Sequence, residues 1–396
     1  MIQSFTIENF KSFEKAILPL APLTVLIGAN ASGKSNAIEA LQLLSWLARG
    51  HSPTDLFYAV REQDLSLRGG LKDLTRGGGE ISLGCEVVEE FDRTPLSFSV
   101  CLEVTEQGLG FKRQRLMDGP IVIFDGPPQG NLDAQLASLE RPHSDGPRYM
   151  LVEMTLSSMF FLDPDPRRMR EYSFVQEKQL KRDGSALSSV LRHLTEEMDQ
   201  KERVLEMIRA LPEQDISDIT YLSTPRGEVM VQLHETFGGQ TMPREAALLS
   251  DGTLRALAVA AALLSVDEGS LVVIEEIDNG VHPSRAEMLL SNIQEIARDR
   301  QLRVLLTTHN PALLDAIPPE AIPDTVACYR DPEKGDSRLI RLEDLESYPE
   351  LIAQGPLGRL VTKGILNRFL KDPAKRDAEA KVEKSLAWLS DFRRRA

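Results

Sequence analysis

The apolar and polar positions of the first thirty residues alternate in the manner of β-strands. Residues 2–10 and 16–20 have this alternation, and residues 23–28 form a short apolar run that ends in glycine. Alternation is typical of a strand with one buried face, and a short apolar run is typical of a strand buried on both faces. In residues 34–50 the apolar positions take helical spacing, and Gly50 is suited to ending that helix.

The middle of the chain has the pattern of an antiparallel sheet followed by helices. Residues 62–79 are glycine-rich and basic and predict a loop, whereas residues 80–125 contain short runs of strand pattern separated by turn residues. The loop-like stretch 126–148 is the best candidate for local disorder. Helical patterning resumes in residues 184–211 and predicts two helices.

The last part of the chain returns to a mixed pattern. Residues 215–223 and 228–237 predict two further strands, and residues 249–342 alternate between helical and strand patterns. Because such alternation is typical of a parallel sheet covered by helices, we expect an α/β fold. The tail from residue 357 predicts two more helices, and the sequence contains no internal repeat and no sustained heptads.

Composition narrows the class of protein. The chain has 396 residues, of which 42% are hydrophobic, enough for a sizeable core in two or three lobes. No segment approaches the roughly 18 consecutive apolar residues of a transmembrane helix, and the start does not resemble a secretion signal. Cys85, Cys101 and Cys328 lack the spacing of a metal site or a disulfide framework. We therefore expect a cytoplasmic protein with no membrane partner.

The charge of the chain is acidic but uneven. A net charge of −14 argues against a surface that binds nucleic acid over its whole extent. Two regions are basic: a loop with Arg68, Lys72 and Arg76, and the tail from Arg359 to the closing "FRRRA". These regions favour binding of DNA. A solvated amphipathic helix explains the tail equally well.

The strongest chemical signal is "GANASGKS", Gly28 to Ser35, which fits the phosphate-loop pattern GxxxxGK[ST]. It follows an apolar strand and opens a helix, as a phosphate site requires. Its glycines allow backbone N–H groups to face a phosphate, assisted by the helix N-terminus. We expect Lys34 to contact the β- and γ-phosphates of ATP and Ser35 to bind Mg²⁺.

The second signal is a buried strand that ends in two carboxylates. "LVVI" runs directly into Glu275 and Glu276. A nucleotide site of this class needs one carboxylate beside Mg²⁺ and another that orients or activates water. Because consecutive strand residues point to opposite faces, we expect the two glutamates to divide these roles.

Two weaker signals flank this strand. Ser250, Asp251 and Gly252 precede a helix, an arrangement that caps a core helix but also forms an anion site. His309 lies at the tip of the strand that follows the two glutamates. Taken alone, each is more often structural. Their order around the carboxylate strand favours contacts with phosphate.

The order of "GANASGKS", "LLSDGT", "LVVIEE", "DNGVHP" and "TTH" resembles the ATP-binding-cassette ATPase heads of the SMC/RecF/OLD-like group. The closest resemblance is to compact bacterial predicted ATPases of that group without long coiled coils, and it is weakest from about 80 to 150. It implies a P-loop NTPase of the ABC-ATPase head type, with a mixed or parallel core sheet, an inserted antiparallel β-lobe and a helical lobe. The expected divisions are 1–61 (nucleotide-binding core), 62–148 (β insertion), 149–212 (helical lobe), 213–342 (second part of the core) and 343–396 (basic helical extension).

The resemblance also implies a role for each residue that matches a family motif. The residues and their implied roles are Gly28, Asn30, Gly33, Lys34 and Ser35 as phosphate loop, with Ser35 on Mg²⁺; Ser250 and Gly252 as the signature that contacts the γ-phosphate held by the other subunit; Glu275 as the metal-side carboxylate; Glu276 as the catalytic glutamate; Asp278 at the dimer interface; His309 as the switch histidine; and, more loosely, Asn9 and Lys11 as nucleotide contacts.

The chain departs from the family pattern in three places. Glu275 stands where the family usually has Asp, which moves the carboxylate about 1.5 Å further out and favours contact with Mg²⁺ through water. The signature reads Ser-Asp-Gly-Thr, and we expect the charged Asp251 to point away from phosphate. Gln63 is the candidate for the glutamine that the family carries in its Q-loop.

The resemblance implies an ATPase switch in which two heads close head-to-tail over two ATP molecules and hydrolysis reopens them. It would gate a DNA-related activity or a separate nuclease or effector protein, in DNA repair or in anti-phage defence. One alternative is the ATPase subunit of a membrane transporter, although more than 200 residues separate Lys34 from Ser250 and transporter heads are more compact. The other is a nucleotide-gated scaffold with little turnover.

Overall fold

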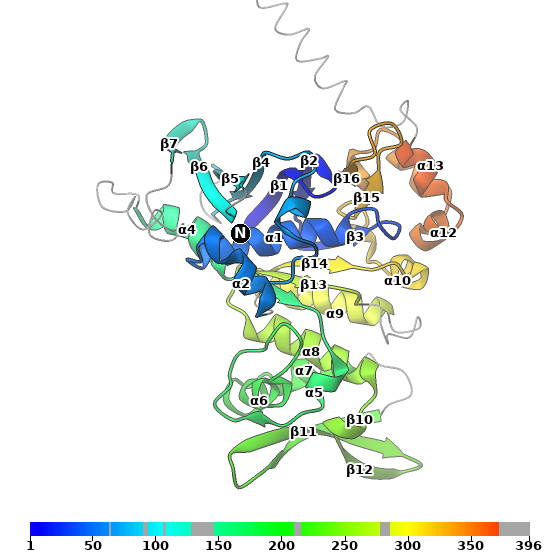
Figure 1. Ribbon diagram of the computed structural model, residues 1–396. Coiled ribbons are helices and arrows are strands. Elements are labelled where there is room, and N and C mark those ends of the chain that lie inside the picture. Colours follow the sequence, from blue (N-terminus) through cyan, green and yellow to red (C-terminus); the bar gives the residue numbers. More distant parts are fainter. Residues whose placement is uncertain are drawn as a thin grey trace, which may run out of the picture.

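A mixed six-stranded sheet forms the centre of the computed structural model, which describes residues 1–62, 65–89, 94–105, 108–127, 146–209, 215–277 and 286–371 (Figure 1). Five of its strands are parallel, and the last strand, β16, pairs antiparallel at one edge. The strands, in their order across the sheet, are β16 (Ser337–Arg341), β15 (Val326–Arg330), β3 (Leu23–Ile27), β14 (Arg303–Thr307), β13 (Leu271–Ile274) and β8 (Phe160–Leu162).

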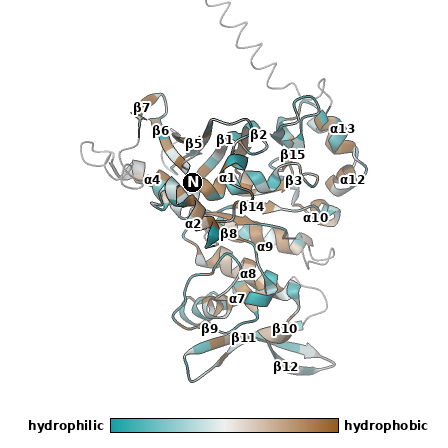
Figure 2. Cartoon of the chain, in the orientation of Figure 1, coloured by the Kyte–Doolittle hydropathy of each residue, from teal (hydrophilic) through white to brown (hydrophobic). Residues whose placement is uncertain are grey.

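The central strands are apolar throughout because both faces of this sheet are covered. In β13, Val272 and Ile274 belong to one hydrophobic core, whereas Leu271 and Val273 belong to the other. Parallel sheets covered by helices on both faces have this near-continuous apolar pattern. The central layers are accordingly the most hydrophobic part of the chain in Figure 2.

The core on one side of the sheet is closed by a helix and a second, antiparallel sheet. Helix α1 (Lys34–Ala48) is almost entirely buried between the two sheets. The strands predicted in residues 80–125 are present, and they extend a sheet that the first two strands of the chain begin. In their order across the sheet, they are β2 (Phe13–Pro19), β1 (Ile2–Phe10), β4 (Glu80–Val87), β5 (Leu96–Thr105), β6 (Gly108–Asp118) and β7 (Ile121–Gly126).

Two short helices flank this part of the molecule. Helix α4 (Gly146–Ser157) packs against α1, β4 and β5, and α2 (Leu56–Arg61) follows α1. The predicted loop 62–79 is irregular where it is described, apart from a short helical turn at Leu71–Leu74. Most of the predicted loop 126–148 lies outside the described residues.

The core on the other side of the sheet is closed by helices, and a third sheet lies beyond them. Helices α8 (Asp251–Ser265) and α9 (Ala286–Asp299) cover this face, and α8 carries a lobe of further elements on its far side (Figure 1). The two helices predicted in residues 184–211 are present. The lobe consists of α5 (Pro166–Met169), β9 (Ser173–Phe174), α6 (Leu187–Arg192), α7 (Lys201–Arg209), β10 (Asp215–Ser223), β11 (Glu228–Phe237) and β12 (Gln240–Glu245).

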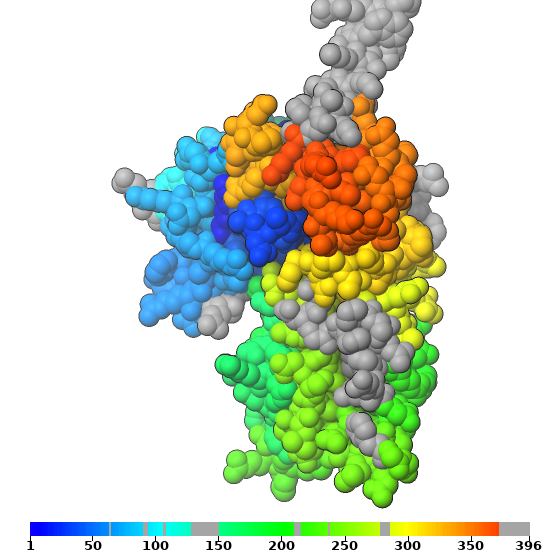
Figure 3. Space-filling model, turned by 90° about the vertical axis from the view of Figure 1, so that its right-hand side faces the viewer, coloured from blue at the N-terminus to red at the C-terminus, as the bar shows by residue number. Residues whose placement is uncertain are grey.

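The C-terminal helices pack against the edge of the core near β14. Helix α10 (Pro311–Asp315) contacts α12 (Leu357–Thr362), which precedes α13 (Ile365–Lys371); α11 (Tyr348–Ile352) contacts α13. Figure 3 shows this red segment against the yellow surface that contains α10. The two helices predicted from residue 357 are present, and the basic end of the tail lies outside the described residues. Among the described helices, none is long and apolar enough to cross a membrane.

Candidate functional site

A cavity of about 580 Å³ opens at the carboxyl ends of the central strands. Its volume is in the range of ligand pockets in proteins. It is lined by residues 29–36 and by Ile38, Arg68, Glu275, Glu276, Thr307, Thr308, His309 and Arg330. The structure therefore brings together seven predicted site residues from three separate motifs: Asn30, Gly33, Lys34, Ser35, Glu275, Glu276 and His309.

The phosphate loop curls between β3 and α1 because its backbone takes conformations that only some residues tolerate. Gly28 has a φ of 154° and Gly33 a φ of 121°, and a Cβ atom at Gly28 would lie 2.3 Å from the carbonyl oxygen of Cys328. Lys34, at the start of α1, donates a hydrogen bond of 2.6 Å from Nζ to the Gly28 oxygen. The N-terminus of a 15-residue helix thus lies at the cavity, where it favours anions.

The loop is held from beneath by polar contacts that the sequence analysis missed. The Ser337 hydroxyl donates to the Ser32 carbonyl oxygen at 2.5 Å, and its oxygen lies 2.7 Å from the Ser12 hydroxyl, within hydrogen-bond distance. Asn36 also donates to the Ser12 hydroxyl, at 2.7 Å. From the cavity side, Arg330 Nε donates to the Ala31 oxygen at 3.1 Å. These partners are up to 325 residues away in the chain, so no local pattern could have revealed them.

The two glutamates lie directly beyond the end of β13. Pairing in β13 ends at Ile274, although the Glu275 N–H still donates to the Leu162 oxygen at 3.0 Å. Glu276 has a left-handed φ of 49°, and its N–H donates to the Thr307 hydroxyl at 2.9 Å. A glutamate rarely adopts this conformation, and such strain is concentrated at functional sites. The strained turn, and not the alternation of a continuing strand, therefore gives the two residues different surroundings.

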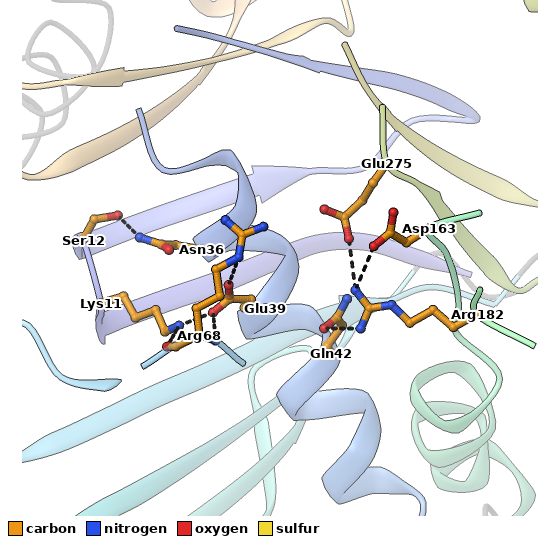
Figure 4. Close-up of polar contacts among 9 residues, drawn as sticks. All are labelled: Lys11, Ser12, Asn36, Glu39, Gln42, Arg68, Asp163, Arg182 and Glu275. Carbon is orange, nitrogen blue, oxygen red and sulfur yellow. Dashed lines mark hydrogen bonds and ion pairs between the residues drawn. The ribbon is translucent and has the colours of Figure 1, made fainter. Parts of the chain in front are cut away.

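Glu275 is a partly buried carboxylate whose negative charge is offset only in part by its neighbours. Its side chain is 17% exposed and contacts Arg182 at 3.3 Å (Figure 4). Burial raises the pKa of Glu275 above its ordinary value, Asp163 raises it further, and Arg182 lowers it. A cation at the cavity would stabilise the ionised form of this side chain.

The donor atoms at this point fit Mg²⁺, the metal that the fold family implies. Magnesium prefers oxygen ligands, and it is usually held by one or two protein groups together with phosphate and water. The Ser35 hydroxyl and the Glu275 carboxylate line the same cavity, and both are oxygen donors. The negative charge of Glu275 is only partly offset by Arg182, which agrees with a site that receives a cation.

A second ionic cluster positions Arg68 at the cavity. Glu39, on α1, is buried and forms ion pairs with Lys11 and with Arg68 (Figure 4). The Arg68 N–H donates to the same carboxylate at 3.4 Å, and Lys11 donates to the Arg68 oxygen at 2.7 Å. Lys11 is thus paired with Glu39, and Asn9 donates to the backbone oxygens of Gly78 and of Glu80, at the start of β4. Neither of these two loosely assigned residues lines the cavity.

The signature residues lie apart from the cavity, at the start of α8. Ser250 caps this helix by accepting a hydrogen bond of 3.1 Å from the Thr253 N–H, as the cap pattern predicts. Arg170 Nη2 contacts Asp251 at 2.6 Å, so the unusual negative charge of this signature has a cationic neighbour. Gly252 is buried in the first turn of the same helix. Asp278 and Gln63 lie outside the described residues.

Two family models match the chain. Residues 1–67 match the family described as AAA ATPase domain. Residues 134–315 match the family described as AAA domain, putative AbiEii toxin, Type IV TA system.

A curated relative matches a short part of the sequence. The DNA replication and repair protein RecF of Gloeobacter violaceus (strain ATCC 29082 / PCC 7421) is 41% identical over 69 residues. This match covers 17% of the present chain and 16% of the relative, so the chain aligns with only about a sixth of that protein.

Solved structures match most of the chain at low sequence identity. An Smc head bound to the C-winged helix domain of ScpA has a TM-score of 0.54 and 14% identity, and the match covers 86% of this chain and 97% of that one. An Smc head with an extended coiled coil, bound to the C-terminal domain of ScpA and derived from Pyrococcus furiosus, has a TM-score of 0.50 and 13% identity, covering 89% and 98%. The comparisons confirm the resemblance inferred from the motifs: the chain has the P-loop fold of an SMC-type ATPase head and is similar in sequence to RecF and to AAA-type ATPases.

Proposed function

We propose that this protein is a Mg²⁺-dependent ATPase that acts as a nucleotide-controlled switch. The observation that carries the proposal is the single cavity at which a phosphate loop, two glutamates and a histidine meet. These groups come from the ends of β3, β13 and β14, which are adjacent parallel strands. Ligands of open α/β sheets bind at this edge, where the strands end.

In this proposal each group has a distinct role. The backbone of the phosphate loop and Lys34 bind the phosphates, while Ser35 and Glu275 hold Mg²⁺. The metal ion supplies positive charge that neutralises the phosphate oxygens. Glu276 orients and polarises the attacking water, and His309 contacts the γ-phosphate. The left-handed φ of Glu276, directly beyond the strand end at Glu275, supports different roles for the two glutamates.

We further propose that two copies close head-to-tail over two ATP molecules. Ser250 and Gly252 lie at the start of α8, outside the cavity, so in this arrangement they would complete the site of a second copy. Asp278 would lie at the interface between the two copies. ATP would then favour the dimer because it binds both copies at once.

A partner protein and DNA are the proposed targets of the switch. The similar solved heads are bound to domains of ScpA, which supports a partner that docks on the head. The RecF relative supports a DNA-related role such as repair, and the description of one matched family as a putative AbiEii toxin of a type IV TA system supports a role in defence. A separate effector such as a nuclease is proposed from the resemblance alone. A salt-dependent shift of duplex DNA by the ATP-bound protein would support direct DNA binding.

The arginines of the basic loop differ in how they are held. Arg76 donates to the backbone oxygens of Ser12 and Lys334, and Arg68 is held beside Glu39 at the cavity. Arg76 is therefore engaged within the head, whereas the Arg68 side chain is 76% exposed and accessible to DNA. The likeness to Smc heads favours the switch over the transporter alternative, and a cytoplasmic location is proposed with it.

The test of the proposal is the loss of nucleotide binding when Lys34 is replaced. In Lys34→Ala the affinity for a fluorescent ATP analogue should fall by at least about tenfold, because a charge-assisted hydrogen bond to phosphate is lost. ATP turnover, measured as phosphate release, should disappear. The control is Lys72→Ala, which removes an exposed lysine that does not line the cavity. Equal binding by the two variants would contradict the proposal.

A further inference from the structure

Two carboxylates lie side by side at the ends of β8 and β13. These strands are parallel neighbours in which Ile274 pairs with Leu162, so the next residues, Glu275 and Asp163, occupy equivalent positions. Neighbouring strands are about 4.8 Å apart, and like charges at such a distance repel one another. The proposed metal ligand therefore has a second negative charge beside it.

Arg182 bridges the two carboxylates. Its Nη2 atom lies 3.3 Å from Glu275 Oε1 and 3.9 Å from Asp163 Oδ2 (Figure 4). Its Nη1 atom donates to the Gln42 side chain of α1 at 3.3 Å. One guanidinium thus joins the phosphate-loop helix to both strand ends, and it is nearer to the more buried carboxylate.

The backbone of Arg182 is fixed, whereas its side chain has two partners within reach. The Asp163 N–H donates to the Arg182 oxygen at 2.9 Å, and the Asp165 N–H donates to the Asp183 oxygen at 2.9 Å. The guanidinium can consequently exchange Glu275 for Asp163 by side-chain rotation alone. Asp163 is 62% exposed, against 17% for Glu275, so solvent screens the new pair but leaves room for the rotated side chain.

We propose that Arg182 is a positioning residue with two states. In the nucleotide-free head its guanidinium supplies the positive charge beside Glu275, and it moves to Asp163 when Mg²⁺ and nucleotide bind. This inference rests on the proposed function. A divalent cation at Glu275 repels the guanidinium, and Asp163 offers the displaced charge a partner on the adjacent strand end. Before the metal binds, Glu275 keeps a positively charged partner in Arg182. When the metal binds, the move to Asp163 removes the repulsion between the guanidinium and the metal ion.

The test measures how much Mg²⁺ contributes to nucleotide binding. The affinity of a fluorescent ATP analogue is measured with Mg²⁺ and with EDTA, and the ratio of the two dissociation constants reports the contribution of the metal. In Arg182→Gln the competing cation is gone, so Mg²⁺ should improve binding about tenfold more than in the wild type. In Asp163→Asn the displaced guanidinium has lost its alternative partner, so the contribution of Mg²⁺ should fall by a similar factor.

Shifts of opposite sign in the two variants support the exchange. Shifts of the same sign, or no shift in either, would overturn it. Because fixed charges alone also give opposite signs, the exchange requires in addition that Asp163→Asn has no effect on the ratio in an Arg182→Gln background; an undiminished effect in that double variant would overturn the exchange. In EDTA, Arg182→Gln should also lower the midpoint of thermal unfolding by a few degrees, whereas Asp163→Asn should not; a lower midpoint in Asp163→Asn would count against the exchange. Lys34→Ala distinguishes failure of the proposed function from failure of the proposed role of Arg182. If Lys34→Ala binds the analogue as well as wild type, the proposed function fails. If it loses binding while the two ratios do not diverge, only the role of Arg182 fails.

Discussion

At the scale of single residues, the partly buried charge of Glu275 destabilises the fold, and the proposed nucleotide site explains why the charge is there. Its carboxylate is partly buried at the end of β13, it has Asp163 as a like-charged neighbour, and its pKa is raised. Groups with perturbed pKa values in a cavity are typical of functional sites. The protein without ligand should therefore be less stable with glutamate at this position than with a neutral side chain of the same shape.

Replacing Glu275 with glutamine should stabilise the metal-free protein and remove turnover. Because the folded-state pKa of Glu275 lies above its ordinary value of 4.5, the ionised form disfavours the fold. The wild type should lose stability relative to Glu275→Gln as the pH rises from the ordinary pKa through this raised pKa. Urea unfolding in EDTA at pH 5 and pH 8 measures this difference. The exposed Glu62→Gln serves as control, and a Glu275→Gln variant that is less stable than wild type at pH 8 would contradict the account.

The motif residues that line the candidate site were predicted from the sequence. The residues that contact and position those motif residues were not. The phosphate loop, Glu275, Glu276 and His309 meet at one cavity, as their order in the chain indicates. Arg182 lies 93 residues from Glu275 and was missed, because no local spacing marks a partner that folding brings from another lobe. Ser337, beneath the loop, was missed for the same reason.

At the scale of elements, the C-terminal helices support the strand end that carries His309. Helix α10 begins two residues after this histidine, with Asn310 as its cap. Helix α12 packs so closely on α10 that a Cβ atom at Gly358 would lie 2.0 Å from the Pro311 oxygen and 2.8 Å from an oxygen of Asp315. Since both atoms belong to the first two turns of α10, a change at Gly358 should be transmitted to the histidine.

A methyl group at Gly358 should therefore separate α12 from α10. We expect Gly358→Ala to destabilise the protein by about 1–3 kcal/mol, as overpacking usually does, and to reduce ATP turnover more than nucleotide affinity. The phosphate loop is held by other contacts, so affinity should persist. Gly110→Ala is the control, because a Cβ atom there meets nothing within 4 Å. Equal unfolding midpoints for the two variants in a thermal scan would contradict this packing argument.

The sequence predicted whether a segment is a helix or a strand better than it predicted which elements lie side by side. The first strand, residues 2–10, has the expected bounds, since alternation is a local signal. The first helix begins at Lys34 as expected and ends at Ala48, two residues before Gly50. The pairing of β1 with β4 was not predicted, because an apolar pattern shows which face is buried but not which strand lies beside it. Very short elements such as α5 and β8 have too few residues to show a period.

At the scale of the whole molecule, the site is proposed to be shared between two copies. The start of α8 lies on the lobe side of the core sheet and does not line the cavity, although its sequence resembles a nucleotide-contacting signature. A second copy placed head-to-tail would bring that helix start to the phosphates. A single chain gives no sequence pattern for such an interface, and the proposal depends on the resemblance to dimeric heads.

The most direct test is the oligomeric state of Glu276→Gln in the presence of ATP. This variant keeps the phosphate loop and the proposed metal ligands but loses the carboxylate that is proposed to polarise water. It should bind ATP and Mg²⁺, show no turnover, and accumulate as a dimer that size-exclusion chromatography with light scattering detects. Wild type should hydrolyse ATP and return to monomer under the same conditions. Unchanged turnover in Glu276→Gln, or an ATP-bound variant that stays monomeric, would contradict the account.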